Sequence, residues 1–167
     1  MATVLFCTKN DIVRQAPYLD GNIDSDKIVP SLHLAQVHSL KQIIGTDLYN
    51  KLSSDISASS LTGNYLTLLK NYIKPILIHL ALAEFLRSAP FTVSNKGVYK
   101  RTSENSSEIS SEELLSLVQI ERDRAQNYTS RFLDHMSFNQ SNYPEWSSNT
   151  NEDISPSYES FGTDWVL

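Results

Sequence analysis

The residues that could carry acid–base or metal chemistry are four histidines and one cysteine, and their spacing does not suit that chemistry. His33 and His38 are five residues apart, and so are His79 and Glu84. Two metal ligands on one face of a helix stand four residues apart, as in the H-E-x-x-H motif of metalloproteases. We therefore expect the histidines to be packed or solvated, and we expect no metal and no cofactor.

Nucleophilic and phosphate-binding motifs are also missing. Cys7 is the only cysteine, so no internal disulfide can form, and a buried small hydrophobe is its expected role. The chain has no G-x-S-x-G, no Walker loop and no G-x-G-x-x-G. The run from Glu121 to Arg124 could supply carboxylates for acid catalysis, but a solvated helix face with internal ion pairs explains it equally well. We predict that the protein is not an enzyme.

The net charge of −5 is unevenly distributed. Residues 1–138 hold all 14 Lys and Arg and 14 of the 19 acids, whereas residues 139–167 hold five acids and no base. One basic stretch has no acid between Phe85 and Thr102, and it contains Arg87, Lys96, Lys100 and Arg101. An isoelectric point near 5.3 disfavours a specific DNA-binding protein. The basic stretch could bind nucleic-acid phosphates weakly, or it could bind the acidic tail of another copy of the chain. We favour binding to the acidic tail.

Periodicity and capping residues predict a mainly α fold, a small helical bundle. Helices are expected at about 8–15, 26–44, 47–56, 62–88 and 111–136. Pro30 is expected in the first turn of the second helix and Gly45 after its end. Pro75 lies inside the long central helix, where it predicts a kink. In the last helix Glu121 interrupts an apolar seam, and we expect the Glu121 side chain to contact water.

Between the last two long helices the pattern changes to that of a β-hairpin, at about residues 90–103. β-branched and aromatic arms flank Asn95-Lys96-Gly97. A lone hairpin is marginally stable, so we expect it to find support on another subunit or a partner protein. The residues proposed for that contact are Phe91, Val93, Lys96, Val98, Tyr99, Lys100 and Arg101.

The last 29 residues form a separate segment in this interpretation. Residues 1–138 make the helical domain, and residues 139–167 make an extended, acidic C-terminal arm. Composition alone indicates a disordered tail. Its aromatic residues favour instead an arm docked on another chain, because aromatic side chains are the usual anchors of interfaces. Those residues are Tyr143, Trp146, Tyr158, Phe161 and Trp165. The first seven residues could add an edge strand or pack as an arm.

No segment has the composition expected of a signal peptide or a membrane span. The N-terminus lacks a basic start followed by a long apolar stretch. The most apolar run, Pro75–Leu86, is about 12 residues and includes His79 and Glu84, which is too short and too polar to cross a bilayer. We expect a soluble protein with no membrane partner.

Several features together resemble the head-to-tail connector (neck or adaptor) proteins of tailed bacteriophages, particularly those of crAss-like phages. They are the stretch IVPSLHLAQVHSLKQIIGTDLYNKL at 28–52, the helix with KPILIHLALAEF, the hairpin, the last long helix and Tyr143-Pro-Glu-Trp146. The resemblance covers about residues 28–146. It implies a structural virion protein that forms a ring, often of twelve copies, beneath the portal.

That resemblance carries further expectations. The ring joins the capsid vertex to the tail and surrounds the DNA channel, with at most non-specific contact with DNA. The portal and other neck or tail proteins are the expected partners, and the place is the virion after assembly in the host cytoplasm. A hairpin and extended termini reach neighbouring subunits in such proteins. Two alternatives stay open: a small-terminase-like DNA-recognition ring protein, and a cellular helical scaffold or regulatory domain.

Overall fold

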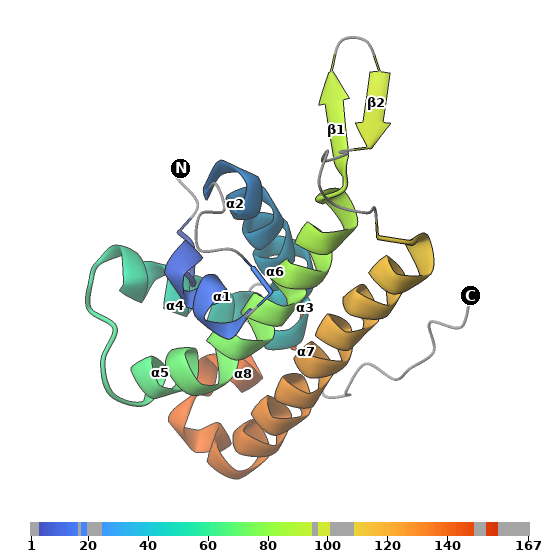
Figure 1. Ribbon diagram of the computed structural model, residues 1–167. Coiled ribbons are helices and arrows are strands. Elements are labelled where there is room, and N and C mark those ends of the chain that lie inside the picture. The colour runs from blue at the N-terminus through green and yellow to red at the C-terminus, as the bar shows by residue number, and fades with distance from the viewer. Residues whose placement is uncertain are drawn as a thin grey trace.

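The computed structural model describes residues 4–16, 18–19, 25–94, 97–100, 109–148 and 153–156, with the backbone alone for 25, 92–94 and 97–100. The predicted mainly α fold is confirmed (Figure 1). The helices in chain order are α1 (Lys9–Gln15), α2 (Ser25–Leu34), η1 (Ala35–Leu40), α3 (Lys41–Ile44), α4 (Thr46–Ser57), α5 (Gly63–Leu68), η2 (Leu69–Ile73), α6 (Lys74–Ser88), α7 (Ser111–Asn139), η3 (Gln140–Asn142) and α8 (Pro144–Ser148).

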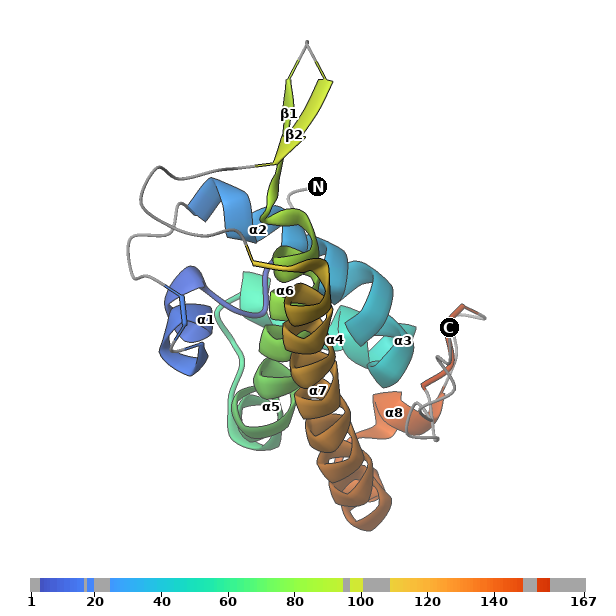
Figure 2. The same ribbon diagram turned by 45° about the vertical axis from the view of Figure 1, so that its right-hand side comes forward.

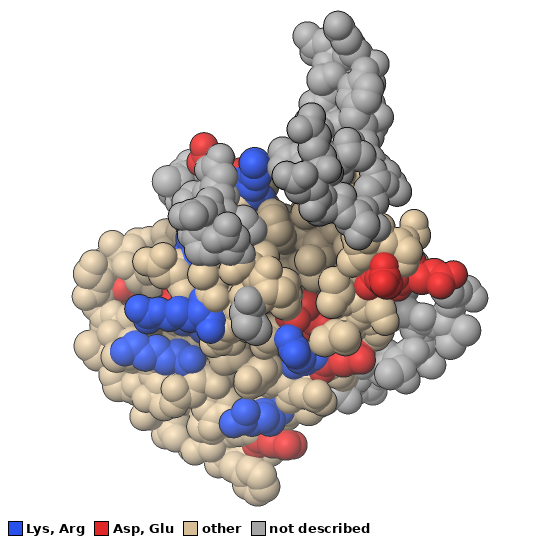
Figure 3. Space-filling view, in the orientation of Figure 1, with Lys and Arg blue, Asp and Glu red and all other residues tan. Residues whose placement is uncertain are grey.

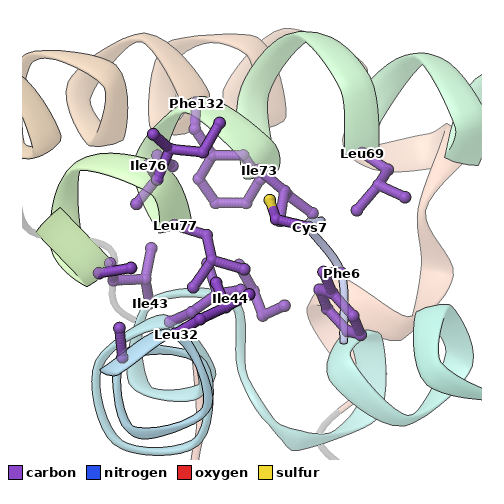
Figure 4. Packing of buried hydrophobic residues seen from close by; sticks show 14 of the residues in the cluster. Phe6, Cys7, Leu32, Ile43, Ile44, Leu69, Ile73, Ile76, Leu77 and Phe132 are labelled. Carbon is purple, nitrogen blue, oxygen red and sulfur yellow. The ribbon is translucent and has the colours of Figure 1, made fainter. Parts of the chain in front are cut away.

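Helix α6 is the centre of the bundle. It packs most extensively against α7 and next against α2, and both neighbours run alongside it in two views (Figures 1 and 2). Its side chains are buried on almost every side, as expected for a helix that is apolar all round. Figure 4 shows how Ile73, Ile76 and Leu77 from this region meet Phe132 of α7 and Leu32 of α2.

The second helix runs without a break from Ser25 to Ile44, but its middle, η1, is a π-helix. In η1 the hydrogen bonds reach one residue further back, as from the Lys41 amide to the Gln36 carbonyl. Pro30 is the sixth residue of this helix and not in its first turn, which corrects the prediction. Gly45 ends the helix at φ 77°, as the sequence indicated.

The hydrogen-bonding pattern of the central helix changes next to Pro75. The π-helix η2 stands directly before α6, and the Lys74 amide bonds the Leu69 carbonyl, five residues back. Pro75 then lies in the first turn of α6. The residue that cannot donate a hydrogen bond therefore falls where the bonding register changes, which is a recognised place for a helix to bend.

Gly63–Ser88 forms one continuous helix of 26 residues that is long and apolar enough, by length and composition, to cross a membrane. The apolar run Pro75–Leu86, which is too short for a span by itself, is only part of this helix. In the fold, 61% of the most apolar window is buried against other elements. A core helix passes the same test, so this is weak evidence for a span.

Two short strands follow α6. β1 (Phe91–Ser94) and β2 (Gly97–Lys100) pair antiparallel, with Phe91 opposite Lys100 and Ser94 opposite Gly97. The pair projects from the end of α6, away from the helical body (Figures 1 and 2). Among the described elements, the strands contact chiefly each other.

Candidate functional site

The projecting strands contain five of the seven residues proposed for contact through the hairpin. Phe91 opens β1 with 46% of its surface exposed. For Val93, Val98, Tyr99 and Lys100 the structure describes the backbone only. Lys96 and Arg101 lie outside the described residues. In the described part of the chain, the strand pair is joined to the helical body where α6 is followed by β1 (Figure 1).

The N-terminal end of α7 lies at the same end of the bundle as the hairpin (Figures 1 and 2). A capping box closes this end of α7: the Ser110 side chain accepts from the Glu113 amide, and the Glu113 carboxylate accepts from the Ser110 amide. These hydrogen bonds lower the pKa of Glu113. Just beyond the cap, Leu115 is 65% exposed, and Ile109 before it is 40% exposed.

The two first aromatic residues of the predicted arm do not reach another chain. Tyr143 and Trp146 are 2% and 3% exposed and belong to the main hydrophobic core of their own chain. The Trp146 ring stands edge-on to Phe132 of α7 at 5.2 Å between centroids, and Tyr143 stands edge-on to Tyr65 at 5.5 Å. The prediction that these two residues anchor an intermolecular contact is therefore wrong. Tyr158, Phe161 and Trp165 lie outside the described residues.

Polar contacts hold the same region to the body. The Tyr65 hydroxyl donates a short hydrogen bond to the Glu145 carboxylate. Burial and this carboxylate raise the pKa of Tyr65. The Tyr143 hydroxyl bonds the Asn64 carbonyl at 3.3 Å and His135 Nε2 at 3.3 Å, and His135 stacks on Tyr72 with 4.3 Å between ring centroids. Partial burial lowers the pKa of His135. The boundary predicted at residue 138 thus falls inside a packed unit.

Residues 153–156 add a last contact on the far side, at the junction of α3 and α4. The Thr46 amide donates to the Ile154 carbonyl at 2.9 Å, and the Thr46 hydroxyl donates to the Asp153 carboxylate at 2.9 Å. Lys41 Nζ lies 2.9 Å from the same carboxylate. The hydrogen bonds from Lys41 and Thr46 lower the pKa of Asp153. Gly45 is the N-cap of α4, and the Thr46 side chain, which would otherwise be free to cap the helix, binds this C-terminal segment.

A buried ionic cluster joins α6 to α7, and the sequence analysis missed it. Glu121 is 1% exposed, although it was expected to be wet. Its carboxylate lies 2.7 Å from His79 Nδ1 and 2.7 Å from Arg124 Nη1. The His79 ring stacks on Tyr128 with 5.4 Å between ring centroids, and the Tyr18 hydroxyl also bonds Glu121. Burial and this carboxylate raise the pKa of Tyr18.

The arrangement of the cluster suits a structural role, in which it holds α6 against α7. A carboxylate only accepts hydrogen bonds, so both oxygens of Glu121 are used by donors from two helices. The sequence contained a signal for it, since Glu121 occupies a core position of the helical repeat. What the sequence could not show is that His79, 42 residues earlier, faces it.

The N-terminal arm is held by another buried polar residue. Gln36 is fully buried in the π-helix η1, and its side chain accepts from the Phe6 amide at 2.8 Å and donates to the Val4 carbonyl at 2.7 Å. It also donates to the Tyr49 hydroxyl at 3.0 Å. Residues 4–7 therefore pack as an arm rather than as a strand. Short π-helical segments inside α-helices are frequently found at functional sites.

The candidates for nucleophilic and metal chemistry have structural surroundings. Cys7 is 2% exposed, and burial raises the pKa of its thiol to about 12, so the reactive thiolate does not form near neutral pH. His33 and His38 lie on the partly or fully exposed side of the second helix. In the part of the chain that the structure describes, no three His, Cys, Asp or Glu side chains are grouped as a metal site requires.

On the face shown in Figure 3, basic and acidic side chains of the described residues are interspersed, and acidic atoms stand out at the N-terminal end of α7. This mixed surface agrees with the near-neutral charge of the helical body.

The chain matches the model of a known family. The profile of a family described as a family of unknown function (DUF6712) matches residues 40–155. This range starts at the end of η1 and ends within the C-terminal segment that docks on Gly45 and Thr46. No curated protein matches the chain, and no solved structure does.

Proposed function

For this chain, which belongs to the family of unknown function DUF6712, we propose a structural role in a virion, as a subunit of the head-to-tail connector (neck) ring below the portal. The ring joins the capsid vertex to the tail and surrounds the DNA channel. Its copies contact one another, the portal and other neck or tail proteins. The proposal starts from the sequence resemblance over about residues 28–146.

The observation that carries the proposal is the contrast between the helical body, which has its own packed core, and the strand pair, which projects from it. The helical body has a continuous core in which residues from the N-terminal arm to α8 are buried. Phe91, whose side chain is the one described in the strand pair, lies outside that core, and the pair projects from one end. Two strands alone are marginal in water, so a partner that covers them is the expected source of their stability. A compact body with a projecting arm suits a subunit that links to neighbours.

The exposed apolar side chains support the same proposal. The large apolar residues that are at least two-fifths exposed include Phe91 at the start of β1, and Ile109 and Leu115 around the start of α7. Scattered exposed apolar residues need no explanation, but several at one end of a small domain favour a contact surface. We propose assembly through this end, with no catalytic role for the chain.

The test is the particle that the full-length chain forms. Electron microscopy and sedimentation velocity of the purified protein should detect a closed ring. Deletion of Val93–Tyr99 should leave a helical protein, by circular dichroism, that stays monomeric. Far-ultraviolet spectra that match between the two proteins serve as the control for folding.

Other results would point elsewhere. A stable monomer of the full chain at all concentrations would favour the cellular scaffold or regulatory alternative. Tight, sequence-dependent binding to duplex DNA would favour the small-terminase-like alternative, because a channel subunit contacts DNA at most through non-specific phosphate interactions. Normal ring assembly by the deletion variant would remove the hairpin from the proposal.

A further inference from the structure

Ile109, just before the cap of α7, and the first two turns of the helix form an exposed surface, which we call the α7 shoulder and define by Ile109, Glu112, Leu115 and the edge residue Leu114. Leu115 is 65% exposed and Ile109 is 40% exposed. Leu114 and Leu117 are half-buried against a small satellite cluster of Ala83, Leu86 and Val118. The α7 shoulder is thus rigidly backed by α6 but open on its outer side.

The charge around the α7 shoulder is acidic. Glu112 is exposed in the first turn of α7, and Glu113 is held in the capping box. From Ile109 to Glu121 the sequence has no Lys and no Arg, and the first base is Arg122. A surface of this kind fits a partner that is apolar in the middle and basic at its edges.

One segment of this same chain has that composition. The hairpin sequence brings four large apolar residues and three bases within eleven positions, and no acid: Phe91, Val93, Val98, Tyr99, Lys96, Lys100 and Arg101. Lys100 stands opposite Phe91 in the strand register, so basic and apolar positions are neighbours along the pair. The hairpin complements the α7 shoulder in both polarity and charge.

Within one chain, the described parts of the strand pair and of the α7 shoulder make no extensive contact with each other. The strands project from the end of α6 and contact chiefly each other, and α7 runs away from them down the side of the bundle (Figures 1 and 2). Leu115 consequently keeps about two-thirds of its surface in solvent.

We propose that the α7 shoulder is the docking site for the hairpin of a second copy of this chain. The inference rests on the proposed ring and names the receiving surface of its subunit contact. The donor and the acceptor are different surfaces, so the contact repeats head to tail and closes into a ring when the rotation between copies is right. The same contact covers Leu115 and the strand pair.

The experiment uses substitutions that spare the fold. Leu115→Asp places a charge in the α7 shoulder and, because Leu115 is largely exposed, should leave the helicity unchanged. We expect at least about a tenfold weaker self-association by sedimentation velocity. The matched control is Phe138→Asp, at a residue that is 88% exposed near the other end of the same helix, and its association should equal that of the unchanged chain.

A mixing experiment then tests the direction of the contact. The Leu115→Asp chain keeps its hairpin, and the chain without Val93–Tyr99 keeps its α7 shoulder, so each alone should be monomeric. Mixed in equal amounts they should form a heterodimer that cannot extend, because only one productive pair of surfaces is left.

The outcomes separate this inference from the ring itself. A ring that forms normally with Leu115→Asp overturns the docking site but leaves the connector proposal standing. Association that stops at a dimer and is lost with Leu115→Asp supports the docking site and overturns the ring. Equal weakening by Phe138→Asp, a mixture that stays monomeric, or an unchanged chain that never associates, each overturns the inference.

Discussion

Glu121 illustrates how a single residue changes its meaning once the chain is folded. Its place in the apolar seam of α7 was visible in the sequence, and its charge suggested a wet position. In the fold it is almost fully buried and shared by His79 and Arg124. A buried charge is tolerated when both of its oxygens have donors, and here the donors come from α6 and from the next turn of α7.

Replacing Glu121 should therefore be costly. Glu121→Ala removes the acceptor of His79 and leaves a cavity, and we expect a loss of about 3–5 kcal/mol in the free energy of unfolding, measured by chemical denaturation. The double variant His79→Leu/Glu121→Leu should recover most of that loss, since an apolar pair needs no hydrogen bonds.

Glu112→Ala is the matched control for this experiment, because Glu112 is an exposed acid on the same helix. Its effect should stay within about 0.5 kcal/mol. A Glu121→Ala variant as stable as Glu112→Ala would mean that the buried cluster does not contribute to stability.

At the scale of elements, the junction of α3 and α4 depends on a glycine and on a segment more than 100 residues away. Gly45 has φ 77° and ψ 162°, a combination that is essentially restricted to glycine. A Cβ at this position would lie 2.8 Å from Pro156 Cδ. The turn between two helices is thus shaped to receive the C-terminal segment.

Gly45→Ala should destabilise the protein more than Gly63→Ala. Gly63 also has a positive φ, 57°, but a Cβ there would meet nothing within 4 Å. We expect about 1 kcal/mol for Gly63→Ala and about 2–3 kcal/mol for Gly45→Ala in the free energy of unfolding, because only the second also displaces Pro156.

The part of the cost that is due to Pro156 can be isolated. In a chain that ends at residue 152, the difference between the two alanine variants should shrink. If it keeps its full size there, the backbone conformation of Gly45 alone accounts for the effect.

At the scale of the whole molecule, the C-terminal elements close the bundle. η3 and α8 bring Tyr143 and Trp146 into the core, and residues 153–156 tie the end of the described chain to α4. The predicted division into a domain of residues 1–138 and a separate arm is therefore replaced by one packed unit that extends to Pro156.

Truncation measures this closure. A chain that ends at residue 138 loses two fully buried aromatic side chains, at about 2–3 kcal/mol each, and should unfold at a clearly lower temperature by circular dichroism. A chain that ends at residue 156 keeps every described contact and should differ from the full chain by no more than about 0.5 kcal/mol. Equal stability of the 138-residue chain would restore the separate arm.

Local patterns in the sequence were sufficient to predict the helices and several of the residues at which they begin or end. The apolar period, the start of α7 and the end of the second helix at Gly45 were readable because each depends on residues within one or two turns of the chain. Cys7 was likewise expected to be a buried small hydrophobe, and it is.

What only the tertiary structure decided are the contacts between residues that are distant in sequence. Glu121 meets His79, Gln36 holds the N-terminal arm, and Trp146 packs on Phe132 instead of on a neighbour. An isolated polar or aromatic residue has the same local signal whether it faces solvent, its own core or another chain. Its place is determined by the free energy of burial with a particular partner, and that partner is known only once the helices have packed.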